Sequence, residues 1–311
     1  MELPPTGVPE PDMTLEPAGF TVDHDGDRIH FLDWGGPARP RASGVVAIHG
    51  LGQTVWAWTP VARRLGGPAG AIRFVAMDLR GHGLSDAPTE DGAYDLDLQG
   101  EDVIAVAEGA GVLASPSDRV VLAGHGFGAI VAAHAARDLR DRCAGLVLVD
   151  GGWEDIESVS GVDVDQFLRE LDEPPEVMRS MSAFLKDRRE FDRSTWDADQ
   201  EQAARATVVE THAGRVVPSA RPHATEAAVR AMFEYAPLAV LPLVDAPVSA
   251  LMGMDDEAGS RAERLDAVSA VRELVHLPPI RTVAFGNIGH NLMRYRPREV
   301  AAAVLALGEG A

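Results

Sequence analysis

The sequence has very little cysteine and no long apolar run. Its 311 residues contain one cysteine, Cys143, so no disulfide can form within the chain and no cysteine cluster can hold zinc or an iron–sulfur centre. Because Cys143 stands in an apolar stretch, we expect a buried thiol rather than a reactive one. The absence of 18 consecutive apolar residues excludes a membrane-spanning helix. Residues 1–19 lack the apolar core of a signal peptide, and we expect a cytoplasmic protein.

Positive charge is also scarce. Lys and Arg total 28 against 48 Asp and Glu, which gives a formal net charge of −20. A chain of this charge repels phosphate backbones and anionic lipid headgroups, so we expect neither nucleic acid nor a membrane as its partner. The 46% hydrophobic content is that of an ordinary globular protein, for which a small-molecule substrate is the expected partner. The sequence does not indicate an oligomeric state.

Short β-branched runs alternate with longer helical patterns from residue 20 onward. This alternation predicts an α/β fold with an eight-stranded, mostly parallel sheet and helices on both faces. The Asp25-Gly26 dipeptide predicts an antiparallel hairpin between the first two strands. We expect strands over residues 20–25, 28–34, 44–50, 73–78, 119–124, 144–150, 247–253 and 281–285, and helices over 58–65, 96–112, 127–142, 260–275 and 297–307.

The stretch over residues 153–241 breaks this alternation. It offers no convincing strand, but it has charged helical patches with interspersed Trp, Phe and Met. We therefore predict a helical insertion, a lid or cap, within a core made of residues 20–152 and 242–311. Residues 1–19 are expected to form a partly ordered N-terminal extension.

The strongest motif lies at residues 119–128, where R-V-V-L-A runs directly into G-H-G-F-G and a helix of small residues follows. This pattern resembles the nucleophile elbow, G-x-S-x-G, of the α/β-hydrolase family. The flanking glycines, Gly124 and Gly128, fit the elbow, whose sharp turn from strand to helix leaves no room for side chains. The central residue is Gly126, which has no hydroxyl, thiol or carboxylate and so cannot supply a nucleophile.

Three further segments resemble the same family in the expected order, so the resemblance extends from residue 20 to residue 307. They are V-V-A-I-H-G-L-G-Q over 45–53, D-L-R-G-H-G-L-S-D over 78–86, and the late pair G-M-D-D over 253–256 and G-H-N over 289–291. The resemblance implies that Asp256 is the catalytic acid and His290 the base. It also implies that the backbone N–H groups of Leu51 and Phe127 form an oxyanion hole.

Three other polar residues near these motifs have competing interpretations. Asp150 ends a predicted strand, where some relatives place the acid, but a structural role is the preferred interpretation. His49 is expected to be structural within its loop. His125 flanks the elbow, where we expect packing or support of the site, with proton transfer as the alternative. No spacing of His and carboxylates indicates a metal, and no glycine-rich phosphate loop indicates a nucleotide, so we expect no cofactor.

Gly126 leaves several functions open. It could be an engineered or otherwise inactivating replacement of serine in an intact serine hydrolase. Alternatively it could be native, with water occupying the vacated space and attacking an ester, lactone or related carbonyl compound. A lyase or cyclase with His290 as general base, and a non-catalytic ligand-binding homologue, are the remaining alternatives. Hydrolysis of an ester or related compound is the expected activity.

Overall fold

The computed structural model describes residues 7–37, 44–254 and 258–308. Within them, eight strands form one sheet in the order β1-β2-β4-β3-β5-β6-β9-β10. The pairs β1–β2 and β2–β4 are antiparallel and the other neighbours are parallel, which confirms the predicted hairpin and the mostly parallel sheet. The strands are β1 (Ala18–His24), β2 (Asp27–Asp33), β3 (Val45–Ile48), β4 (Phe74–Met77), β5 (Val120–His125), β6 (Cys143–Val149), β9 (Val248–Met254) and β10 (Arg281–Gly286).

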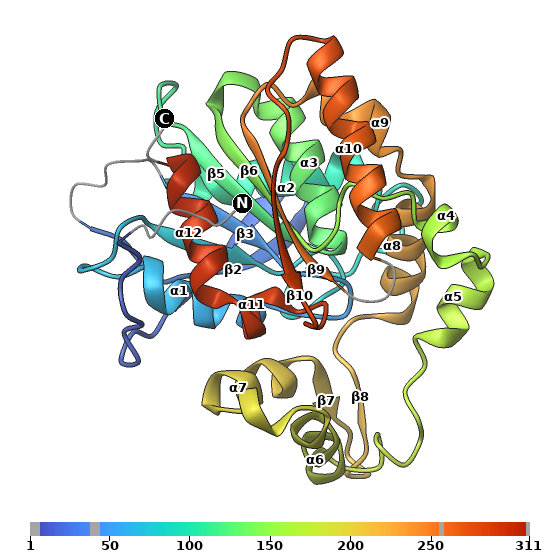
Figure 1. Cartoon of the computed structure of the whole chain (residues 1–311). Helices are drawn as coiled ribbons and strands as arrows, with labels where there is room; N and C mark the ends of the chain where they lie inside the picture. Colours follow the sequence, from blue (N-terminus) through green and yellow to red (C-terminus); the bar gives the residue numbers. More distant parts are fainter. Residues whose placement is uncertain (1–6, 38–43, 255–257, 309–311) are drawn as a thin grey trace.

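Helices cover both faces of the sheet (Figure 1). One face carries α1 (Thr59–Leu65), α11 (Leu292–Tyr295) and α12 (Pro297–Gly308). The other face carries α2 (Leu96–Gly109), α3 (Phe127–Leu139) and α10 (Ala258–Leu274). All five predicted core helices are present, and each face has its own apolar cluster because a sheet covered on both sides must be apolar on both sides.

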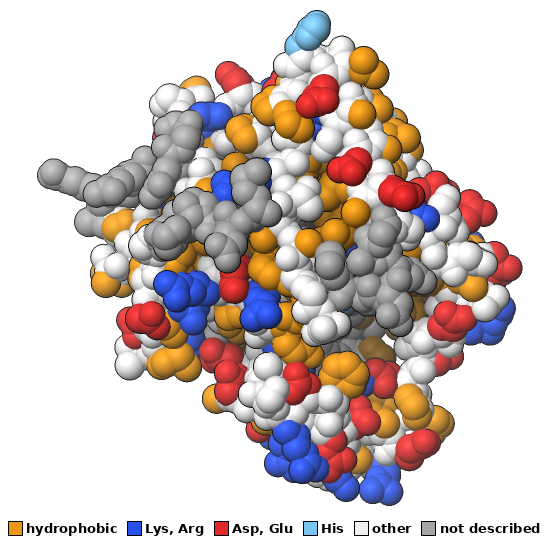
Figure 2. Space-filling model, in the orientation of Figure 1, with side chains coloured by type: hydrophobic (Ala, Val, Ile, Leu, Met, Phe, Trp, Pro, Cys, Tyr) orange, Lys and Arg blue, Asp and Glu red, His pale blue; other side chains and the backbone are white. Residues whose placement is uncertain are grey.

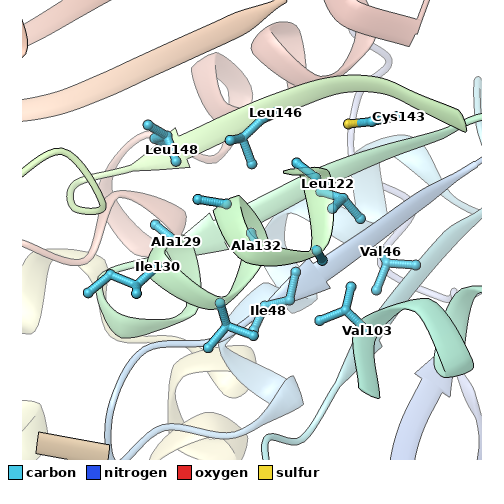
Figure 3. Packing of buried hydrophobic residues seen from close by; sticks show 14 of the residues in the cluster. Val46, Ile48, Val103, Leu122, Ala129, Ile130, Ala132, Cys143, Leu146 and Leu148 are labelled. Carbon is cyan, nitrogen blue, oxygen red and sulfur yellow. The ribbon is translucent and has the colours of Figure 1, made fainter. Parts of the chain in front are cut away.

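The core is densest where α3 crosses the central strands. Figure 3 shows Ala129 and Ile130 of α3 packed toward Ile48, Leu122 and Leu148 of the strands. Cys143 belongs to the same cluster and is buried, which raises the pKa of its thiol to about 12. The prediction of a buried, unreactive cysteine is thus confirmed.

Residues 153–241 form an inserted segment between β6 and β9. It is mainly helical, but it also contains an antiparallel hairpin of β7 (Val208–Glu210) and β8 (Val216–Pro218), which corrects the prediction that the segment has no strand. These strands have three residues each and are mostly exposed, too short for an alternating pattern to stand out. The other elements are α4 (Ile156–Ser160), α5 (Val164–Glu170), α6 (Met181–Phe191), η3 (Arg193–Thr195), α7 (Ala198–Ala206), α8 (Pro222–Glu234), α9 (Pro237–Val240) and η4 (Leu241–Leu243).

Part of the inserted segment, comprising α6, α7, β7 and β8, projects as a separate lobe at the bottom of Figure 1. A buried ion pair attaches this lobe to the core: the Arg63 Nε in α1 lies 2.9 Å from Asp199 Oδ2 in α7. The same guanidinium donates to the Leu15 carbonyl at 2.7 Å, so it also holds the N-terminal residues. Among the described residues, no helix is both long and apolar enough to cross a membrane.

Candidate active site

The elbow lies where β5 ends and α3 begins. Its central residue, Gly126, has φ 52° and ψ −117°, a conformation that costs other residues strain and that glycine adopts freely. A Cβ at Gly124 would meet the backbone of Gly128, and a Cβ at Gly128 would meet the carbonyl groups of Ile48 and His49. The steric reason for the two flanking glycines is therefore the one predicted from the motif.

The imidazole of His290 faces the central position of the elbow. A Cβ built on Gly126 would lie 3.1 Å from His290 Nε2. His290 stands between β10 and α11, 164 residues after Gly126, and its side chain is 62% exposed. The structure thus brings together the elbow and the predicted base, with no side chain from Gly126 between them.

Among the described residues, the carboxylate that contacts His290 is that of Asp150, at the end of β6. Its Oδ2 accepts a hydrogen bond from His290 Nδ1 at 2.7 Å. This contact is the one expected at the acid position, which was the less preferred interpretation of Asp150 from the sequence. It forms because the loop after β10 passes back over the end of β9, where a Cβ at Gly253 would lie 3.2 Å from the Ile288 oxygen, and so reaches the end of β6. Asp256, the predicted acid, lies outside the described residues, and its role stays a prediction.

Asp150 is held by a buried set of partners that the motifs did not reveal. Its Oδ1 accepts from Gly253 N at 2.8 Å and from Arg261 Nη1 at 2.9 Å. Arg261 also pairs with Glu154 at 2.9 Å. Burial would raise the pKa of Asp150, but the hydrogen bond and charge of His290, the charge of Arg261 and the Gly253 N–H outweigh it, so that pKa lies below its ordinary value. Asp150 is therefore an ionised partner for an imidazolium at His290.

His125 connects the loop of His290 to the loop after β3. Its Nε2 lies 3.0 Å from the backbone oxygen of His290, and its Nδ1 lies 3.0 Å from Gln53 Oε1. The same Gln53 oxygen accepts from Gly50 N at 3.0 Å. Burial, followed by the nearby His290, lowers the pKa of His125 to about 3. Both ring nitrogens lie against protein oxygens, so His125 supports the two loops between which it stands.

Backbone donors are available where the resemblance placed the oxyanion hole. Leu51 follows β3 and Phe127 is the first residue of α3, and both line the same cavity as Gly126 and His290. The first N–H groups of a helix have no partner within the helix, and the helix dipole favours negative charge there. An oxyanion beside Phe127 would therefore meet a backbone donor and the positive end of the helix dipole, and the N–H of Leu51 stays the predicted second donor.

His49 and His82 lie beneath this loop and not in the cavity. His49 Nε2 accepts from Leu79 N at 3.1 Å, and burial lowers its pKa. His82 Nε2 accepts from Gly52 N at 3.2 Å, and burial lowers its pKa to about 4. Both imidazoles accept a hydrogen bond from a backbone N–H and support the loop that carries Leu51, which agrees with the structural role predicted for His49.

A cavity of about 1190 Å³ lies between the core and the inserted segment, with the elbow and His290 in its wall. The inserted segment contributes apolar lining from Phe167, Met178, Phe184, Trp196 and Met232. Figure 2 shows acidic side chains scattered over this face of the molecule rather than gathered in one patch. Among the described residues there is no group of three or more His, Cys, Asp or Glu side chains that could hold a metal ion.

Comparison with known proteins agrees with this geometry. The model of the alpha/beta hydrolase family matches residues 45–303. The chain belongs to the α/β-hydrolase family. The resemblance inferred from the motifs is thereby confirmed, and the eight-stranded sheet with its helices is the fold of this family.

Two curated relatives of this α/β-hydrolase are epoxide hydrolases. Epoxide hydrolase 4 of Mus musculus is 29% identical over 111 residues, which is 36% of this chain and 28% of that protein. Bifunctional epoxide hydrolase 2 of Sus scrofa is 28% identical over 133 residues, 42% of this chain and 20% of that protein. The chain therefore spans less than a third of the length of these relatives.

Solved structures match over nearly the whole chain. The thioesterase domain from the curacin biosynthetic pathway has a TM-score of 0.68 at 21% identity and covers 93% of this chain and 99% of its own. E-2-(acetamidomethylene)succinate hydrolase has a TM-score of 0.72 at 17% identity, with 94% and 99% covered. A thermophilic esterase from Thermogutta terrifontis has a TM-score of 0.64 at 21% identity, with 94% and 97% covered. At these identities the likeness establishes the fold.

Proposed function

We propose that this protein hydrolyses an ester, a lactone or a related carbonyl compound with a water molecule that His290 activates directly. The observation that carries the proposal is the free position beside the base. Even a Cβ built on Gly126 would lie 3.1 Å from His290 Nε2, so no side chain separates the elbow from the base, and a water in the space of a serine hydroxyl can accept or donate a hydrogen bond at Nε2. Glycine therefore leaves room for the nucleophile that serine would otherwise supply.

The reaction follows from the orientation of the imidazole. Because His290 Nδ1 donates to Asp150, Nε2 carries the lone pair and can take a proton from water. The water oxygen attacks the carbonyl carbon, and the carbonyl oxygen becomes an oxyanion facing the N–H groups of Leu51 and Phe127. When the tetrahedral intermediate collapses, the leaving oxygen takes the proton from His290. The ionised Asp150 stabilises the imidazolium between these two proton transfers.

The inserted segment acts in this proposal as the lid of the site. Its apolar side chains form much of the cavity wall opposite the elbow. A substrate with an apolar part would bury that part against them, which contributes binding free energy and excludes bulk water from the oxyanion. In this proposal, the shape of the cavity wall selects which esters or lactones bind.

The decisive experiment compares the unsubstituted protein with His290→Ala on a panel of p-nitrophenyl esters and lactones. Removal of the general base should lower kcat by roughly 10²- to 10⁴-fold. The matched control is His212→Gln, because His212 is exposed on the inserted segment and does not line the cavity. Turnover that His290→Ala leaves undiminished would refute the proposal.

A Gly126→Ser variant separates water attack from a lost serine nucleophile. Serine at this positive φ costs about 1–3 kcal/mol of strain and occupies the place of the water, so the proposal expects no gain in turnover. A large gain that disappears in the Gly126→Ser, His290→Ala double variant would instead identify an intact serine hydrolase that lacks only its hydroxyl.

A further inference from the structure

Arg294 lies on the cavity wall four residues after His290. It belongs to α11, whose N-cap residue Asn291 accepts the Arg294 backbone N–H on its side-chain oxygen at 3.2 Å. Arg294 and His290 both line the cavity, so the arginine stands within the span of a small substrate bound at the base.

The guanidinium of Arg294 is bonded to neutral acceptors. Its Nε donates to Thr195 Oγ1 at 2.6 Å and its Nη2 donates to the Asp192 backbone oxygen at 2.7 Å. Among residues 7–37, 44–254 and 258–308, no carboxylate oxygen lies within 4.0 Å of this guanidinium, and its Nη1 has no hydrogen-bond partner. Within these residues, Arg294 therefore lines the cavity with a free donor at Nη1 and without a carboxylate bonded to its guanidinium.

Two other arginines in the cavity wall differ from Arg294. Arg261 pairs with Asp150 and Glu154, and Arg188 pairs with Glu173. Asp192 directs its carboxylate to the backbone and hydroxyl of Ser194 and to the Thr195 hydroxyl, and the hydrogen bonds from Ser194, together with the charge of Arg294, lower its pKa. An arginine at a ligand cavity that has no carboxylate within 4.0 Å among the described residues is a site for an anion supplied by the ligand.

We propose that Arg294 binds a carboxylate that the substrate carries in addition to the carbonyl group attacked at His290. This inference rests on the proposed function and narrows it to half-esters, half-amides or related mono-acyl derivatives of short dicarboxylic acids. The free Nη1 and the second hydrogen on Nη2 are the two donors for this carboxylate. His290 and Arg294 are four residues apart and line one cavity, which favours a short linker between the two groups of the substrate.

Arg294 also joins α11 to η3, because its two neutral acceptors belong to residues 192–195. If the role of Arg294 is purely structural, its substitution should weaken the binding of every ligand of the cavity alike. If Arg294 is an anion subsite, its substitution should weaken the binding of charged ligands and leave that of neutral ligands of the same shape unchanged. The two roles are therefore separated by a pair of ligands that differ only in charge.

The experiment measures binding by calorimetry at pH 7.5 and 0.15 M salt, with glutarate and its neutral diamide, glutaramide, as probes. We expect Arg294→Gln to weaken glutarate binding by about tenfold or more and to leave glutaramide binding unchanged. Arg294→Lys keeps the charge and loses the planar donor pair, so its affinity for glutarate should lie between those of the unsubstituted protein and Arg294→Gln. Arg189→Gln is the matched control, since Arg189 is exposed on α6 and does not line the cavity.

Failure of glutarate to bind the unsubstituted protein, or equal losses for both probes in Arg294→Gln, would overturn the subsite. The proposed hydrolysis is tested separately with p-nitrophenyl esters. His290-dependent hydrolysis of neutral esters, with no gain in kcat/KM for glutaric acid monoesters, would keep the proposed function and reject the subsite. Arg294-dependent glutarate binding with no turnover of any ester would keep the subsite and reject the proposed function.

Discussion

The two halves of the site are built in different ways. The elbow half, residues 124–128, is buried between β5 and α3, and its shape depends on backbone packing around glycines. In the acid–base half, Asp150 and His290 are 140 residues apart and meet through side chains, and the His290 side chain is 62% exposed. The elbow can therefore be recognised from a short stretch of sequence. The pairing of Asp150 with His290 depends on which strand ends lie next to one another in the fold.

The variant with the largest expected effect replaces Asp150, the carboxylate that contacts His290. Asp150→Asn should lower kcat by roughly 10²- to 10⁴-fold, because an amide no longer stabilises the imidazolium and can favour the wrong tautomer of His290. Asp256→Asn should have little effect if Asp150 alone orients the base. The measurement is kcat on the ester that the panel identifies, with circular dichroism to confirm that each variant folds.

Asp150→Asn also removes the partner of the buried Arg261. The double variant Asp150→Asn, Arg261→Gln controls for that unpaired charge, and it should stay as inactive as Asp150→Asn. An activity loss in Asp256→Asn equal to that in Asp150→Asn would show that the acid comes from the loop after β9.

A second test uses two buried histidines, His125 of the elbow half and His82 beneath the loop that carries Leu51. Burial lowers the pKa of His125 to about 3 and that of His82 to about 4, against about 6.5 in an unfolded chain. Between those values the unfolded chain binds protons that the folded protein does not, so the free energy of unfolding should fall as pH decreases below about 6.5. Each histidine contributes about 1.4 kcal/mol per pH unit in that window and nothing above it.

Urea unfolding at pH 7.5, 6.5, 5.5 and 5.0 measures this slope. His125→Gln should reduce the slope by about one proton, and the exposed His212→Gln should leave it unchanged. A slope that His125→Gln does not alter would mean that His125 is not a neutral buried ring.

The smallest expected effect concerns the link between the two halves. His125 contacts the His290 backbone oxygen and Gln53, so its removal should loosen the loop of the base without removing any group that contacts substrate. His125→Leu should lower kcat by roughly tenfold, about the effect of one lost hydrogen bond, with KM little changed. His125→Gln, which keeps one donor, should lose less; an equal loss in both variants would argue against the hydrogen bond.

The predicted elements agree closely with the structure where apolar runs are continuous. All eight core strands and five of the six core helices were predicted, because a buried parallel strand is apolar throughout and a strand-to-helix turn is marked by glycines; α11, with four residues, was not. The hairpin of β7 and β8 was missed. Its one local signal is Gly214, whose positive φ of 76° turns the chain between two strands of three residues.

The contact of Asp150 with His290 was considered from the sequence but not preferred, for a different reason. An aspartate at the end of a buried strand has the same sequence signature whether it caps the strand or contacts a histidine 140 residues later. Its supporting partners, Arg261 and Glu154, stand in segments without any motif. The bonding of the Arg294 guanidinium to neutral acceptors could not be predicted either, because an arginine in the sequence does not reveal which carboxylates lie near it.

By itself the sequence determined the family, the elbow without a nucleophile, and the histidine predicted as base, since these depend on glycine sterics and on apolar periodicity within short segments. Only the tertiary structure decided which described carboxylate contacts His290, which histidines are buried, and which cavity arginine has no carboxylate within 4.0 Å among the described residues. These features are distances between residues remote in the chain, and packing of the sheet and the inserted segment sets them.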